Sequence, residues 1–125
     1  MTKNNKKIIW VFGDYRNYYQ NRVTLQLIAR AVALAKVINA EVCALIFGYE
    51  IDEWIMEYTA HGADRILAID DPELQSYSTE KYLAIIEALA KERDPEIILI
   101  GATDFGREFA PRLAKRLKTG LSADC

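Results

Sequence analysis

The chain has 125 residues, which is room for one domain. Its composition, 51% hydrophobic and 27% charged, excludes a disordered chain. A net charge of −2, from 16 basic and 18 acidic residues, argues against nucleic-acid binding. No apolar run approaches the roughly 18 residues of a membrane span, and the run IIWVF is too short for a signal peptide. We therefore expect a cytoplasmic protein.

Cysteine and histidine are too sparse and too scattered to predict a metal site. Cys43 and Cys125 are far apart, and a CxxC pair is absent from the sequence. Cys43 stands in the apolar run EVCALIF and is expected in the core. The single histidine, His61, precedes Gly62 and is expected at a helix end.

Short continuous apolar runs predict strands that are buried on both faces, as in a parallel sheet. The four runs are KIIWVFG (7–13), EVCALIFG (41–48), RILAID (65–70) and EIILIGA (96–102). The first seven residues of the chain are expected to be a flexible tail.

Helical periods of apolar residues lie between these runs, at 22–39, 50–61 and 78–93. Thr24 or Asn21 is a candidate cap for the first helix. Gly62 is expected to stop the second, and Asp94-Pro95 the third.

The alternation of strands and helices predicts an α/β fold with a doubly wound, mostly parallel five-stranded sheet of order 3-2-1-4-5. The fifth strand would begin near Leu121. In this order the switch point lies between strands 1 and 4, and ligands bind beyond the carboxyl ends of strands at such a point. The loops concerned are 13–21 and 101–108.

The loop GATDFGRE after strand 4 has two interpretations. Gly101 and Gly106 would let the backbone approach a phosphate, with Thr103 and Arg107 beside it. The spacing matches neither the dinucleotide fingerprint nor the Walker loop, and it departs from the glycine pattern of universal-stress-type nucleotide domains. The alternative is a tight turn that packs a helix on the sheet.

Pro111 suggests that the last helix begins late, near Phe109, because an internal proline costs about 3 kcal/mol. Residues 103–108 would then be extended, with Thr103, Asp104 and Arg107 facing a partner.

The segment YRNYYQNR is either a contact surface or an exposed polar loop. Asp70-Asp71-Pro72 is expected to be a turn rather than a pair of reacting carboxylates. Lys115, Arg116 and Lys118 are expected to form a solvated helix end. No nucleophile, base and orienting group come together, so we predict no catalytic residues.

Three segments, which together span about residues 8–125, resemble the alpha subunit of electron transfer flavoprotein. GATDFGREFAPRLAKRLKTGLSADC carries the long and fairly specific motif. HGADRILAIDDPELQSYSTEKY resembles the middle of that subunit, and IIWVFGDYRN resembles its opening strand.

The resemblance implies that residues 8–125 are the N-terminal domain of that subunit, with a nucleotide-alpha-hydrolase-like (Rossmann-like) fold. It implies pairing with a beta subunit and electron transfer from acyl-CoA-type or other dehydrogenases, with bifurcation in some members. FAD would be held mainly by a C-terminal domain that follows Cys125 and is absent from this chain.

On this view the chain is scaffold and subunit interface, binds no cofactor or metal alone, and is not an enzyme. Interface candidates are Tyr15, Arg16, Tyr18, Asp104, Arg107 and Arg112. The alternative is a stand-alone universal-stress-type module that binds AMP or ATP through Gly101, Thr103, Gly106 and Arg107. A small hydrolase on this fold is a third and weaker possibility.

Overall fold

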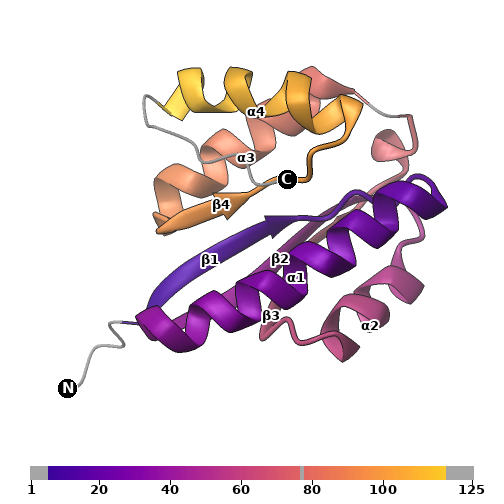
Figure 1. Ribbon diagram of the computed structural model, residues 1–125. Helices are drawn as coiled ribbons and strands as arrows, with labels where there is room; N and C mark the ends of the chain where they lie inside the picture. Colours follow the sequence, from indigo (N-terminus) through magenta and orange to yellow (C-terminus); the bar gives the residue numbers. More distant parts are fainter. Residues whose placement is uncertain (1–5, 77, 118–125) are drawn as a thin grey trace.

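A parallel sheet with helices on both faces forms the domain (Figure 1). The computed structural model describes residues 6–76 and 78–117. Within them four strands lie in the order β3-β2-β1-β4, which confirms the predicted order and places the switch point between β1 and β4. The fifth strand predicted near Leu121 lies outside the described residues.

Strands and helices alternate along the chain as predicted. The strands are β1 (Lys7–Phe12), β2 (Ala40–Gly48), β3 (Arg65–Asp70) and β4 (Ile97–Leu99). The helices are α1 (Tyr18–Ile38), α2 (Asp52–Ala60), a short 3-10 turn η1 (Pro72–Leu74), α3 (Thr79–Arg93) and α4 (Asp104–Leu117).

The continuous apolar runs arise because the two central strands are covered on both sides. In β1, Trp10 and Phe12 face the core under α3 and α4, while Ile9 and Val11 face the core under α1 and α2. A strand whose side chains alternate between two buried faces appears in the sequence as an unbroken apolar run.

Cys43 of β2 is 3% exposed, and burial raises the pKa of its thiol to about 11.

The first helix begins earlier than its apolar period indicates. Asn17 caps α1, accepting a hydrogen bond from the Gln20 amide at 2.9 Å, so the expectation of a cap at Thr24 or Asn21 was wrong. Periodicity missed this turn because Tyr18 and Tyr19 are exposed and add nothing to the buried stripe. The expected loop 13–21 is therefore shorter, and its second half is helical.

The last helix begins at Asp104, not near Phe109, and continues through Pro111. The Thr103 hydroxyl accepts a hydrogen bond from the Gly106 amide at 3.0 Å, which fixes the helix start. Burial of Phe105, Phe109 and Leu113 along one face offsets the cost of the proline, a contribution of about 2 kcal/mol per side chain. Residues 104–108 are thus helical rather than extended.

Two smaller expectations concern helix ends. His61 is the C-cap of α2, and its ring Nδ1 lies 2.9 Å from the Glu57 carbonyl oxygen, as the helix-end role predicts. Gly62 follows with φ of +118°, a conformation that glycine adopts without strain.

None of the helices in the described part of the chain is long and apolar enough to cross a bilayer.

Helices α3 and α4 lie side by side on one face of the sheet (Figure 1). Ion pairs join them on the outer surface. Arg116 contacts Glu80 and Glu87 of α3, each at 3.1 Å, and Arg112 also pairs with Glu80. Arg116 is therefore not simply part of a solvated helix end. Lys118 lies outside the described residues.

We expect the Arg116 pairs to make the stability of the domain fall in acid. Hydrogen bonding to Arg116 lowers the pKa of Glu87, so this contribution is present above the ordinary glutamate pKa of about 4.3 and is lost as pH falls through the lower folded value. Arg116→Ala should flatten the loss of stability between about pH 5 and pH 3. Urea unfolding across this range measures it. Equal slopes for the wild type and the variant would contradict the pairing.

Candidate functional site

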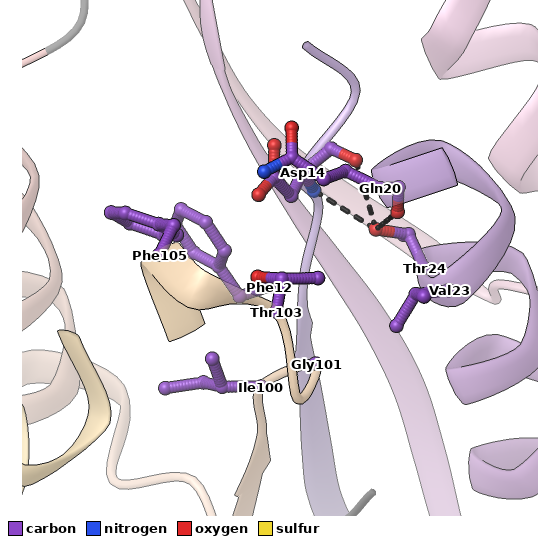
Figure 2. Close-up of a pocket in the computed structure, with 9 residues that line it drawn as sticks. All are labelled: Phe12, Asp14, Gln20, Val23, Thr24, Ile100, Gly101, Thr103 and Phe105. Atoms are coloured by element: carbon purple, nitrogen blue, oxygen red, sulfur yellow. Dashed lines mark hydrogen bonds between the residues drawn. The ribbon is translucent and has the colours of Figure 1, made fainter. Parts of the chain in front are cut away.

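The carboxyl ends of β1 and β4 meet at the switch point, where the loop after each strand contributes side chains (Figure 2). The cavity between them measures only about 10 Å³, close to the volume that one water molecule requires. A nucleotide does not fit without movement of the loops. The lining residues are Phe12, Asp14, Gln20, Val23, Thr24, Ile100, Gly101, Thr103 and Phe105.

Both glycines of the predicted phosphate loop are in close contact with the protein itself. A Cβ at Gly106 would lie 1.8 Å from the carbonyl oxygen of Gly101. A Cβ at Gly101 would lie 2.6 Å from a methyl group of Val23 on α1. These approaches let α4 start directly against the end of β4 and let that loop pack on α1, which accounts for both glycines without a ligand.

The other two residues of that predicted loop lie differently. Thr103 is 6% exposed and caps α4. Arg107 points to solvent, with 68% of its side chain exposed, and pairs with Asp104 at 3.3 Å. The four residues are close in the chain, but Arg107 is exposed, whereas Thr103 and Gly106 are buried and Gly101 is half-buried.

Asp14, which follows β1, is 8% exposed and is the acidic residue of the switch point. Its amide donates to the Thr24 hydroxyl at 3.0 Å. Arg16 donates to both carboxylate oxygens, from Nε at 3.0 Å and from Nη2 at 3.1 Å. The guanidinium also lies 4.8 Å from the centre of the Phe105 ring, so one arginine ties the β1 loop to the start of α4.

Tyr15 turns inward rather than outward. Its hydroxyl donates to the carbonyl oxygen of Phe47 at 3.2 Å, and Tyr82 of α3 donates to the same oxygen at 3.3 Å. Burial raises the pKa of the Tyr15 hydroxyl, and the charges of Asp14 and Asp70 add to the increase, so the hydroxyl keeps its proton as a donor. The Tyr15 ring packs on Trp54 at 4.6 Å between ring centres.

The predicted interface residues therefore divide into two groups. Tyr18 is 78% exposed, and Asp104 and Arg107 are also exposed near the carboxyl end of the sheet. Tyr15 and Arg16 are held by contacts within the domain, and Arg112 is paired with α3.

The turn expected at Asp70 and Asp71 begins one residue later, because Asp70 ends β3 and Asp71 leads into η1. The Asp70 carboxylate accepts from the Glu50 amide at 2.8 Å, and Asp71 caps η1 by accepting from the Glu73 amide at 2.8 Å.

Within residues 6–76 and 78–117, no group of three or more histidine, cysteine, aspartate or glutamate side chains is arranged to hold a metal ion.

The sequence analysis placed Asp14 in the switch-point loop 13–21 without naming it as a site residue, and it missed Trp54 and Tyr82 as residues of this end of the sheet. Asp14 stands two residues after the end of an apolar strand, which is a usable signal because the carboxyl ends of parallel strands gather polar groups. Trp54 and Tyr82 were read only as members of helical stripes, and their meeting with Tyr15 depends on the fold.

Comparisons with known proteins agree with this architecture. The family model described as the electron transfer flavoprotein domain matches residues 9–125. The electron transfer flavoprotein subunit alpha of Clostridium acetobutylicum is 39% identical over 125 residues, which are 100% of this chain and 37% of the relative. The corresponding subunit of Thermoanaerobacterium thermosaccharolyticum is 41% identical over 122 residues, 98% of this chain and 37% of the relative.

A likeness to a solved structure concerns the fold alone. A universal stress protein in complex with cAMP superposes with a TM-score of 0.61 at 18% identity, over 95% of this chain and 96% of that one.

The chain spans little more than a third of the length of the two subunits it matches. The family match covers nearly all of the residues, and the parallel sheet and its switch point agree with the fold expected for it. The chain belongs to the electron transfer flavoprotein domain family.

Proposed function

We propose that the chain is the N-terminal domain of an electron transfer flavoprotein alpha subunit, with residues 8–125 serving as scaffold and subunit interface. The observation that carries the proposal is the family match over residues 9–125, joined by relatives near 40% identity that are named as alpha subunits. In the intact protein the partner is a beta subunit, and FAD is bound mainly by a C-terminal domain outside this chain. Electrons pass from dehydrogenases through that flavin in the cytoplasm.

The packing at the switch point supports a scaffold role for the glycine loop. Gly101 and Gly106 approach the protein's own atoms, and the cavity beside them has the volume of about one water. The loop thus serves to join β4, α4 and α1. This geometry weighs against the universal-stress-type alternative, in which the same loop would hold AMP or ATP.

The exposed residues at the carboxyl end of the sheet are the strongest interface candidates. Tyr18 begins α1 with 78% of its surface exposed, and Tyr19 beside it is 65% exposed. Tyrosine is enriched among residues that dominate binding energy at protein interfaces. Arg107 and Asp104 add exposed charge at the start of α4.

We expect Tyr18→Ala to weaken association with the cognate beta subunit by about tenfold or more, because truncating an aromatic anchor of an interface costs about 2 kcal/mol. Calorimetric titration of the purified chain with the beta subunit measures the change. Val37→Ala is the matched control, since Val37 is 80% exposed on the same helix about 28 Å away along its axis.

Three results bear on the proposal. Absence of any association would contradict the partner assignment. Association that Tyr18→Ala leaves unchanged would contradict the interface. Binding of AMP or ATP that Arg107→Ala abolishes would favour the nucleotide module instead.

A further inference from the structure

A groove that shares no lining residue with the small cavity at the glycine loop lies between the β1 loop, α2, η1 and α3. Its volume is about 240 Å³. Its aromatic walls are Tyr15 and Trp54, already packed on each other at 4.6 Å, and Tyr82. The remaining lining residues are Arg16, Leu74 and Gln75.

The walls of this groove are held in place from behind. Tyr15 and Tyr82 donate to one oxygen, the carbonyl of Phe47, from two different elements. Gly48 has no room for a side chain, because a Cβ there would lie 1.6 Å from the Tyr15 hydroxyl. Leu74, the last residue of η1, is 6% exposed and also lines the groove. The aromatic surfaces are therefore fixed before any ligand arrives, which lowers the cost of binding.

The charge of the groove is nearly balanced. Arg16 is the cation that lines it, and its guanidinium donates to both carboxylate oxygens of Asp14, at 3.0 and 3.1 Å. A guanidinium that already holds a carboxylate at two points attracts a further anion weakly. The groove is thus suited to an uncharged group rather than to a phosphate.

Two polar groups of the lining have hydrogen-bonding capacity to offer. Within the described residues, neither the side-chain amide of Gln75 nor the indole N–H of Trp54 has a hydrogen-bond partner. The amide supplies donors and an acceptor, and the indole supplies one donor. Flat rings with nitrogen and amino groups at their edges satisfy such partners while they stack on aromatic faces.

We propose that this groove binds a neutral heteroaromatic ring of about the size of a purine base. The volume sets the limit: pockets for drug-sized ligands measure roughly 300–1,000 Å³, so 240 Å³ holds one ring system and not a whole dinucleotide. The ring stacks on the Tyr15–Trp54 pair, and Gln75 contacts its polar edge. The site is separate from the glycine loop and from the partner surface at Tyr18, so it does not depend on the proposed subunit role.

The test uses adenosine as the probe and the Trp10→Phe variant of the chain, in which Trp54 is the remaining tryptophan. Trp10 is 1% exposed in the sheet, so its removal isolates the signal of the groove. Adenosine should quench Trp54 saturably with a dissociation constant below about 1 mM, and ribose should not. Absence of saturable quenching would overturn the proposal.

Calorimetry on variants then locates the site. Trp54→Leu should weaken adenosine binding about tenfold through lost stacking. Gln75→Ala should weaken it about fivefold through a lost hydrogen bond. Tyr49→Ala is the control for Trp54→Leu, because Tyr49 is an exposed aromatic residue that does not line the groove, and it should change nothing. Circular dichroism confirms that each variant is folded.

AMP separates this groove from the glycine loop. AMP should bind within about threefold of adenosine, since Asp14 already compensates the charge of Arg16. AMP binding that is about a hundredfold tighter and is lost in Arg107→Ala would place the ligand at the glycine loop and overturn the proposal.

Discussion

Replacing Gly106 with alanine is expected to lower the free energy of unfolding by about 3 kcal/mol. The added Cβ would lie 1.8 Å from the Gly101 carbonyl oxygen and 3.2 Å from a side-chain carbon of Ile100. The nearest atom belongs to the backbone at the end of β4, so α4 must move to relieve the contact. Helix propensity acts in the opposite direction, because alanine is favoured over glycine in a helix by about 1 kcal/mol. The steric term dominates.

Thermal unfolding followed by circular dichroism measures this effect, with a midpoint expected to fall by about 10 °C or more. Arg107→Ala is the matched control, since Arg107 is the next residue of the same helix and is exposed; it should change stability by no more than about 0.5 kcal/mol. An alanine at position 106 that stabilised the domain would mean that the helix does not start against β4. If the Gly106→Ala variant were as stable as the wild type and the domain bound a nucleotide, the loop would be a mobile phosphate loop instead.

Truncating Phe109 to alanine is expected to cost about 4 kcal/mol, the largest loss we predict. Phe109 is 0% exposed and holds α4 on the sheet. Its ring centre lies 5.2 Å from that of Phe12 on β1 and 4.9 Å from that of Phe105. Deletion removes these contacts and leaves a cavity that the neighbouring rings can fill only in part.

Urea unfolding of Phe109→Ala and Phe109→Leu separates loss of contact from change of shape. The leucine variant should cost no more than about 1.5 kcal/mol, because most of the buried volume remains. Glu108→Ala, at an exposed neighbouring position, should be nearly neutral. A small loss for Phe109→Ala would mean that α4 is not anchored to β1 through this side chain, and the account of why Pro111 is tolerated would then be wrong.

These two variants also bear on function, because both act on the place where a nucleotide loop would be. If the packing of Gly106 and Phe109 is needed for stability, the loop serves to fasten α4 to the sheet. A domain whose switch point is filled by its own atoms is suited to present a fixed surface to a partner. This agrees with the proposed role as a subunit scaffold.

The sequence by itself determined the sheet and its order. The four apolar runs became β1 to β4. The central strands β1 and β2 are covered on both sides and are therefore apolar nearly throughout. β3 lies at an edge of the sheet and has no fully buried residue, so the expectation of burial on both faces was wrong for this strand. The alternation of strands with helices then restricted the possible topologies to a few, since parallel strands are connected by right-handed crossovers. Cys43 in the core and His61 at a helix end followed from the same local patterns. The long motif at 101–125 resembles the family that the match over residues 9–125 shows.

Only the tertiary structure decided where the helices begin and what the loops do. Asn17 caps α1 although the first helical turn is exposed, so the apolar period could not reveal it. Pro111 stays inside α4 because Phe105 and Phe109 gain more by burial than the proline costs. A glycine at position 106 is compatible with a nearby phosphate and with a nearby carbonyl oxygen, so the sequence does not distinguish the two. In the fold, the carbonyl oxygen of Gly101 lies there. Contacts between residues far apart in the chain, such as Tyr15 and Tyr82 on one carbonyl, have no local signal, because the packing of separate elements brings them together.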